Sequence, residues 1–256
     1  MKLFFHKRDE VPIPHFIDIH SHILPGIDDG ARSEGQALAM LQTAEQQGIG
    51  IIIATPHNMP GKGNAEKDRV LLLADFMNGE AERRGLNVRV LTGCEIYYRQ
   101  EVPELLEQGA LLTMNGSHCV LVEFDYMASR SYIRNALKEI LGLGYRPILA
   151  HAERYPSLME KDFATIREFR KMRALVQINA SSVTGEHGTQ ARKDTVRMLK
   201  QSLVDFVATD AHSNRSRGPY LKECREVLVK ICGGEYVREL LYENARKLFI
   251  EYQKDR

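Results

Sequence analysis

The chain has 256 residues, 43% of them hydrophobic and 27% charged, and its formal net charge is +1. This length fits one large α/β domain or two small ones, and the composition is that of an ordinary globular protein. The basic residues are scattered and every apolar run is shorter than a membrane span. These features argue against a nucleic-acid partner and against insertion into a membrane.

The cysteines and the N-terminal residues indicate the cellular compartment of the protein. No two cysteines form a C-x-x-C pair or a spacing typical of zinc clips; they are Cys94, Cys119, Cys224 and Cys232. We therefore expect free, reduced thiols and a cytoplasmic location. Residues 1–14 are basic, and their apolar run is too short for a secretory signal. We expect an N-terminal arm there and, over residues 1–256, a single domain.

Strand-like and helix-like segments alternate along the chain. Strands are predicted at residues 16–20, 49–55, 88–94, 116–124, 147–150, 175–179 and 204–209. Helices are predicted at residues 33–48, 66–84, 101–108, 132–143, 162–172, 189–201, 220–231 and 236–249. This alternation predicts a parallel α/β architecture of about seven strand–helix units, one unit short of the usual eight-unit barrel.

Residues that can bind metals stand at or just after the carboxyl ends of the predicted strands. The first strand ends in His20-Ser21-His22, and strand alternation places both imidazoles on one face. The full set is His20, His22, His57, Glu95, Glu123, His151, Asp210 and His212. In a parallel barrel these ends converge on the face where such enzymes keep their active sites.

This set predicts a catalytic centre with more than one metal ion. Each residue alone is a weak signal, but together they are too many ligands for one cation, and thiolates are absent among them. Glu123 lies between apolar residues, where an unpaired charge costs several kcal/mol unless it is bound to a cation. The remaining histidines are interpreted as structural or solvated; they are His6, His15, His118 and His187.

Seven separated segments, in order, resemble the PHP (polymerase and histidinol phosphatase) superfamily. More closely, they resemble the bacterial protein-tyrosine phosphatases encoded with capsule and exopolysaccharide genes, the CpsB/CapC/YwqE-like group. The segments are Asp18–Gly30, Ala54–His57, Gly93–Tyr98, Val122–Phe124, Ala150–Arg154, Gln177–Asn179 and Ala208–His212. The resemblance implies a distorted (β/α)7 TIM-like barrel, the PHP fold, with three divalent metal ions.

The resemblance also distributes the ligands. It assigns the first ion to His20, His22, Glu95 and Asp210, the second to Glu95, Glu123 and His151, and the third to Asp29, His57 and His212. Asp29 is preferred to its neighbour Asp28 on alignment alone. Manganese is often the most effective metal in such enzymes, although iron or zinc can occupy the site.

Two arginines are implied as phosphate ligands by the same resemblance, Arg154 and Arg217. A guanidinium matches two phosphate oxygens at once, so this residue type is suited to the role. Arg215 lies close enough in sequence to compete with Arg217 for it.

The expected reaction is hydrolysis of phosphotyrosine on proteins, with a metal-activated hydroxide attacking phosphorus in line. The resemblance implies a bacterial tyrosine kinase with a tyrosine-rich tail as substrate, one that regulates polysaccharide assembly.

The alternative functions are those of a small-molecule phosphatase such as histidinol-phosphatase, a metal-dependent nuclease, and a non-catalytic scaffold. The absence of a convincing C-x5-R phosphate loop argues against a cysteine nucleophile. The one match, from Cys232 to Arg238, runs across a helix-like stretch and has no glycine-rich cradle after its first residues. The oligomeric state is left open.

Overall fold

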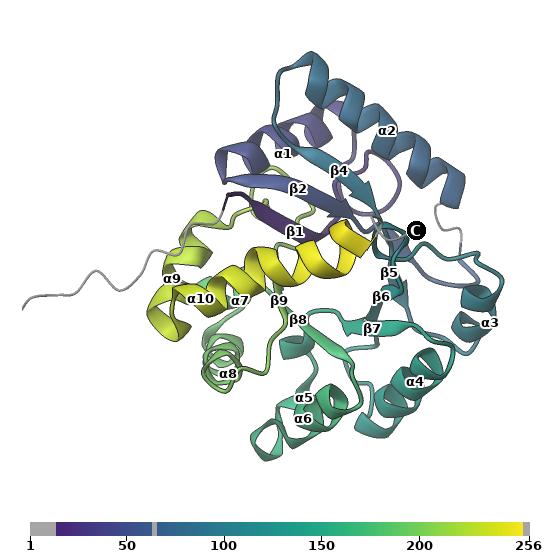
Figure 1. Cartoon of the computed structure of the whole chain (residues 1–256), viewed down its shortest axis with the longest axis vertical. Coiled ribbons are helices and arrows are strands. Elements are labelled where there is room, and N and C mark those ends of the chain that lie inside the picture. The colour runs from purple at the N-terminus through teal and green to yellow at the C-terminus, as the bar shows by residue number, and fades with distance from the viewer. Residues whose placement is uncertain (1–13, 63–65, 253–256) are drawn as a thin grey trace, which may run out of the picture.

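The computed structural model describes residues 14–62 and 66–252. Nearly all of the predicted N-terminal arm, with His6, lies outside the described residues. Strands alternate with helices along this part of the chain (Figure 1). None of its helices is long and apolar enough to cross a membrane.

Parallel strands form two named sheets. The first contains β1 (Phe16–Ser21), β2 (Ile49–Ala54) and β4 (Arg89–Thr92), in that order. The second contains, in order, β3 (His57–Asn58), β5 (Glu95–Tyr97), β6 (Cys119–Glu123), β7 (Arg146–Leu149), β8 (Leu175–Asn179) and β9 (Phe206–Ala208). All of their pairings are parallel.

The two sheets form one curled wall. β3 continues the path of β2 and β5 that of β4, and the N–H of Gly93 donates to the Ala54 carbonyl at 2.9 Å where the path breaks. The other junction joins β1 to the segment after β9. There the N–H of His22 donates to the carbonyl of Ala211 at 2.8 Å, and the N–H of Asp210 donates to the carbonyl of His20 at 2.8 Å. The described chain therefore makes seven strand passes, which confirms the predicted α/β barrel-like architecture.

Helices pack around the strands, as Figure 1 shows. They are α1 (Glu34–Gln46), α2 (Lys67–Arg83), α3 (Val102–Glu107), α4 (Arg130–Gly142), α5 (Pro156–Met159), α6 (Ala164–Lys171), α7 (Ala180–Thr184), α8 (Thr189–Lys200), α9 (Lys222–Cys232) and α10 (Gly234–Arg238), which continues helically through Glu239–Glu243 and Arg246–Ile250. Ser33 caps α1, and its side chain accepts a hydrogen bond from the N–H of Gln36 at 3.3 Å.

The structure differs from the sequence prediction at several places. The continuous strand predicted at 88–94 ends at Thr92, and a new strand starts at Glu95. His57, which follows the strand predicted at 49–55, lies in a separate two-residue strand, β3. The short helices α5 and α7 were not predicted, because four or five residues are too few to show helical periodicity.

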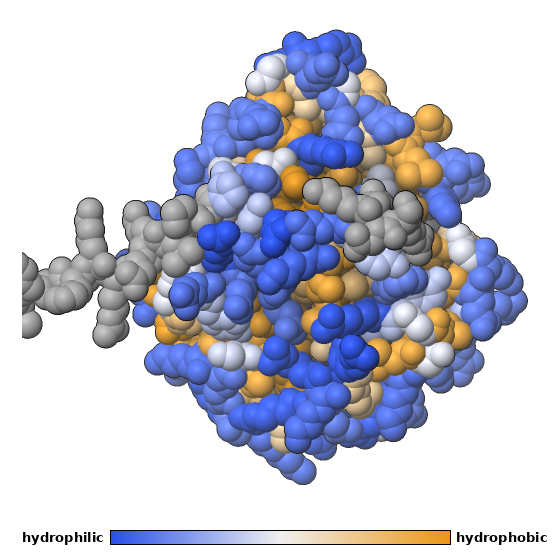
Figure 2. All heavy atoms as spheres, in the orientation of Figure 1, coloured by the Kyte–Doolittle hydropathy of each residue, from blue (hydrophilic) through white to orange (hydrophobic). Residues whose placement is uncertain are grey.

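The hydrophobic core has two parts. A large cluster lies between the strands and the helices, and a smaller one fills the barrel with side chains such as Ile19, Ile53, Leu121 and Ile148. Phe249 of the C-terminal helix belongs to the smaller cluster. On the face crossed by that helix, hydrophilic side chains predominate, with hydrophobic ones between them (Figure 2). The core thus fixes the strands whose carboxyl ends carry the predicted ligands.

Candidate metal centre

All nine predicted metal ligands lie at or just beyond the carboxyl ends of β1, β2, β4, β6, β7 and β9. His20 and His22 stand at the end of β1, Glu95 begins β5, and Glu123 ends β6. The others are Asp29 in the loop after β1, His57 in β3, His151 after β7, and Asp210 and His212 after β9. Three overlapping groups of these side chains are close enough to hold cations.

Glu95 lies at the middle of the cluster, and only 1% of its side chain is exposed. Its Oε2 lies 3.2 Å from His20 Nε2, 3.3 Å from His22 Nε2 and 3.1 Å from His57 Nδ1. Its other oxygen, Oε1, lies 2.9 Å from His151 Nε2. One carboxylate therefore contacts four imidazoles, which is the position that a bridging ligand needs.

His20, His22 and Glu95 form the first group, and Asp210 lies beside it. His20 and His22 approach each other to 3.3 Å between their Nε2 atoms. Asp210 Oδ1 lies 3.6 Å from His20 Nε2 and 3.5 Å from His22 Nε2. With Glu95, these are the four residues that the resemblance assigns to one ion.

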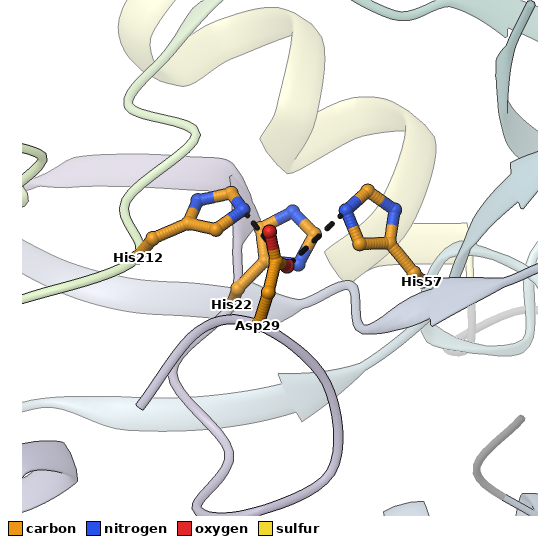
Figure 3. Close-up of side chains that lie close together, drawn as sticks. All are labelled: His22, Asp29, His57 and His212. Carbon is orange, nitrogen blue, oxygen red and sulfur yellow. Dashed lines mark ion pairs between the residues drawn. The ribbon is translucent and has the colours of Figure 1, made fainter. Parts of the chain in front are cut away.

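A second group forms around Asp29 (Figure 3). Asp29 Oδ1 lies 3.4 Å from His57 Nε2 and 3.3 Å from His212 Nε2. His22 also lies within this group, between the other two rings, although the resemblance places it only with the first ion. His22 therefore stands at the boundary between two adjacent positions.

Glu123 completes a third group beside Glu95. Its Oε1 lies 3.1 Å from His57 Nδ1, and its Oε2 lies 3.8 Å from His151 Nε2. The Glu123 carboxylate is only 15% exposed, and these two imidazoles are the partners that a charge in an apolar strand needs.

The ring orientations of the histidines fit metal binding. His20 Nδ1 faces the side-chain oxygen of Gln177 at 3.2 Å, and His212 Nδ1 faces the Asp210 carbonyl at 2.9 Å. When a hydrogen on Nδ1 is held by such an acceptor, Nε2 presents its lone pair, and in both residues Nε2 points into the cluster. Nitrogen and oxygen donors held in this way suit divalent manganese, iron or zinc.

The electrostatics also favour cations at this place. Burial alone would raise the pKa values of the Glu95 and Asp210 carboxyls, yet the His20 imidazole and its neighbours hold both well below their usual range. Burial opposes protonation of His57, but the Glu123 and Glu95 carboxylates raise its pKa to about 10. The buried carboxylates thus require positive charge beside them, and divalent cations would supply it in place of protons.

Asp28 is a functional residue that the sequence prediction passed over in favour of Asp29. Its Oδ2 lies 2.7 Å from His22 Nδ1 and accepts the N–H of His57 at 3.1 Å, and its Oδ1 accepts the N–H of Gly30 at 2.9 Å. Burial opposes its charge, but the contact with His22 lowers the pKa of Asp28 to about 2. Gly30 permits this turn, because a Cβ there would lie 2.1 Å from the His22 carbonyl oxygen.

We expect Asp28→Asn to lower manganese affinity roughly 10- to 100-fold, because the amide orients His22 less well and cannot accept the backbone N–H groups as strongly. Calorimetric titration of the metal-free protein with Mn²⁺ measures this. The control is Asp75→Asn on the exposed face of α2, which should bind as the wild type does. Equal affinity in Asp28→Asn would show that Asp28 does not orient His22.

Both predicted arginines lie beside Asp210. Arg154 Nη1 is 3.4 Å and Arg217 Nη2 is 3.2 Å from Asp210 Oδ2, which also accepts a hydrogen bond from Asn179 Nδ2 at 2.9 Å. The two guanidiniums are 39% and 44% exposed, so they border solvent next to the cluster. The guanidinium of Arg215 has no hydrogen bond or ion pair within residues 14–62 and 66–252.

Residues that orient the ligands are the part of the site that sequence reasoning missed. Besides Asp28, they are Asp18, Glu153, Gln177 and Asn179. Asp18 accepts the N–H and the hydroxyl of Thr209, and Gln177 Oε1 accepts the N–H of His151 at 2.8 Å. All of them lie inside the segments that carry the resemblance, which is the one signal that could have found them.

The backbone at two ligand positions is strained. His151 and Asp210 have φ values of +33° and +52°, in the left-handed region that non-glycine residues rarely adopt. Such conformations persist where the surrounding structure imposes them, often at functional sites.

Three of the four remaining histidines are described, and none belongs to the three groups. His15 packs edge-on against Tyr242 at 5.4 Å between ring centres, and His118 against Tyr252 at 5.1 Å. His187 borders two surface cavities.

Together, the barrel and its cluster define a class: an α/β barrel with a candidate centre for several divalent cations at its active face. The chain belongs to the capsular polysaccharide synthesis CpsB/CapC family, whose model matches residues 16–250. The resemblance recognised in the sequence is therefore confirmed.

Individual relatives match over nearly their full length. The tyrosine-protein phosphatase CpsB of Streptococcus agalactiae serotype III (strain NEM316) is 32% identical, covering 91% of this chain and 97% of the relative. The tyrosine-protein phosphatase YwqE of Bacillus subtilis (strain 168) is 34% identical, covering 91% of each chain. One solved structure is 33% identical to this chain. Its description names YwqE from Bacillus subtilis and CpsB from Streptococcus pneumoniae as unique metal-dependent tyrosine phosphatases. The structure superposes with a TM-score of 0.84 over 91% of this chain and 94% of that one.

Proposed function

We propose that this protein is a metal-dependent protein-tyrosine phosphatase. The observation that carries the proposal is the convergence of nine candidate nitrogen and oxygen ligands, with Glu95 at their middle and with Arg154 and Arg217 beside Asp210. The names of the relatives and the solved structure support the reaction and its dependence on metal.

The proposed centre holds three divalent ions, manganese foremost, with iron or zinc as substitutes. His20, His22, Glu95 and Asp210 would hold the first ion, Glu95, Glu123 and His151 the second, and Asp29, His57 and His212 the third. Bound ions of this kind activate water and neutralise charge on a phosphoryl group.

The protein's own groups bind and orient the phosphate. Arg154 and Arg217 both donate hydrogen bonds to Oδ2 of Asp210, so that carboxylate holds both guanidiniums at the edge of the cluster. Each guanidinium can donate two parallel hydrogen bonds to phosphate oxygens, which stabilises the charge that they carry during transfer. Because both side chains border solvent, a phosphate on a protein surface can reach them.

The proposed physiological substrate is the phosphorylated tail of a bacterial tyrosine kinase that controls capsule or exopolysaccharide synthesis, and the proposed location is the cytoplasm. The family's place in capsular polysaccharide synthesis supports this assignment.

A direct test compares kcat/KM of the manganese-loaded protein on a phosphotyrosine peptide, histidinol phosphate and single-stranded DNA. We expect turnover of the peptide to exceed that of the other two. Faster hydrolysis of histidinol phosphate would replace the proposal with a small-molecule phosphatase, and faster cleavage of DNA with a nuclease.

We expect Cys232→Ser to retain wild-type turnover. Burial raises the pKa of the Cys232 thiol to about 11, so little thiolate is present near neutral pH. Arg238, which completes the spacing of a cysteine phosphatase loop, is instead paired with Glu243 at 2.8 Å. Assays of both proteins with and without a chelator measure the outcome. Loss of activity in Cys232→Ser, together with full activity of the wild type in chelator, would indicate a cysteine nucleophile.

A further inference from the structure

Two cavities adjoin the arginines, and His187 lines both of them. The Arg217 cavity, about 180 Å³, is bordered by Asp210, Arg217 and His187. The Arg154 cavity, about 720 Å³, is bordered by Arg154, Glu153, Glu160, Asp194 and His187. Because Arg154 and Arg217 both contact Asp210, a phosphate held between them would lie at the edge of both cavities.

The Arg154 cavity is much larger than the space that a phosphate requires, and its charge is uneven. Its cationic groups are already paired: Arg154 with Asp210, and Arg197 with Asp162 at 2.9 Å and Asp194 at 3.4 Å. Arg197 also lies over the Phe163 ring, 4.7 Å from its centre.

Two of its three carboxylates, those of Glu160 and Glu153, are less fully satisfied. Glu160 is 59% exposed, and its only ion pair within residues 14–62 and 66–252 is a long one to Arg130, at 3.7 Å. Glu153 is 5% exposed. Its Oε1 accepts hydrogen bonds from the Asn179 N–H and the Ser182 hydroxyl, but its Oε2 is buried with no partner among the residues described. No donor offsets the negative charge of this oxygen, so the wall of the cavity favours a cation beside it.

The remaining wall of the cavity is suited to the stem of a long side chain. Tyr126, Pro156, Met159 and Ala191 contribute apolar surface, and Tyr126 is 61% exposed. A lysine or arginine buries its methylene stem along such surface while its charged head reaches polar groups beyond.

We propose that the Arg154 cavity is a substrate subsite for a cationic side chain that flanks the phosphotyrosine. Glu160 attracts the charge, Tyr126 and Met159 pack against the stem, and the carboxylate of Glu153 behind the cavity wall adds to the attraction without direct contact. This subsite rests on the proposed phosphatase function and adds to it a preference for basic peptides.

The test uses the manganese-loaded full-length protein and three sets of phosphotyrosine peptides, with lysines, alanines or glutamates placed before or after the phosphotyrosine. p-Nitrophenyl phosphate, which has no flanking residues, reports the chemical step alone. The variant is Glu160→Gln, and its matched control is Glu82→Gln on the exposed face of α2.

We expect the wild type and Glu82→Gln to favour the lysine peptides over the glutamate peptides by about fivefold in kcat/KM, mostly through KM, as partly exposed charge pairs provide. Glu160→Gln should lose most of that preference while turning over p-nitrophenyl phosphate normally. Peptide turnover that is indifferent to flanking charge, or a lysine preference unchanged in Glu160→Gln, overturns the subsite and leaves the phosphatase intact. A wild type that hydrolyses neither p-nitrophenyl phosphate nor any peptide overturns both.

Discussion

Glu95→Gln will lower kcat/KM for a phosphotyrosine peptide by about a thousandfold or more, because bound cations contribute several kcal/mol to stabilising the reacting phosphoryl group. The glutamine is nearly the same size, so the fold is preserved. What it removes is the charge that contacts His20, His22, His57 and His151. No other residue in the cluster contacts all four of these imidazoles, so its loss affects more than one ion.

Metal content measured beside activity separates this explanation from a folding defect. We expect Glu95→Gln to keep its circular dichroism spectrum and to hold fewer ions per chain. The matched control is Glu80→Gln, which removes a carboxylate paired with Arg84 at 3.3 Å in α2, and which should retain full activity and metal. A Glu95→Gln protein with normal metal and normal turnover would show that Glu95 does not bridge the ions.

Arg154→Ala and Arg217→Ala will each lower kcat/KM by about a hundredfold, as the loss of a positioned donor to a transition-state oxyanion does. Metal content should stay at the wild-type level, because neither arginine can coordinate a cation. Lysine at either position should restore only part of the activity, since it carries the charge without the paired donors of a guanidinium.

Arg215→Ala provides the matched control for this pair. Arg215 is two residues from Arg217, but of these two arginines Arg217 alone has an ion pair with Asp210. Steady-state kinetics should place Arg215→Ala close to the wild type. If Arg215→Ala lost activity while Arg217→Ala kept it, the assignment of the second phosphate ligand would be reversed.

Local signals in the sequence were sufficient for much of the fold. β8 spans residues 175–179 as predicted, and α8 ends one residue earlier than predicted. The prediction of one strand over 88–94 missed the break between β4 and β5, because valine, leucine and cysteine dominate this segment and a single glycine is compatible with a continuous strand. The break depends on tertiary contacts at Gly93, where a Cβ would lie 3.2 Å from both Ile53 and Met114.

The candidate ligands could be predicted because the chemistry of metals selects histidine and carboxylate, and the barrel places strand ends together. Residues that hold those ligands carry no such signature. Asp28 and Asp29 are identical in type and adjacent, and only the folded loop separates their contacts: Asp28 with His22 Nδ1, and Asp29 with His57 and His212. Gln177 reaches His20 across 157 positions of the chain, which local sequence does not indicate.

The most direct test of the metal centre is elemental analysis of the purified protein combined with phosphotyrosine-peptide turnover, before and after chelation and with His22→Ala in parallel. We predict three divalent ions per chain in the active protein, loss of turnover on chelation, and recovery when manganese is returned. His22→Ala should hold fewer ions and stay inactive after manganese is added. Full turnover by the chelated, metal-free protein would contradict the proposed mechanism.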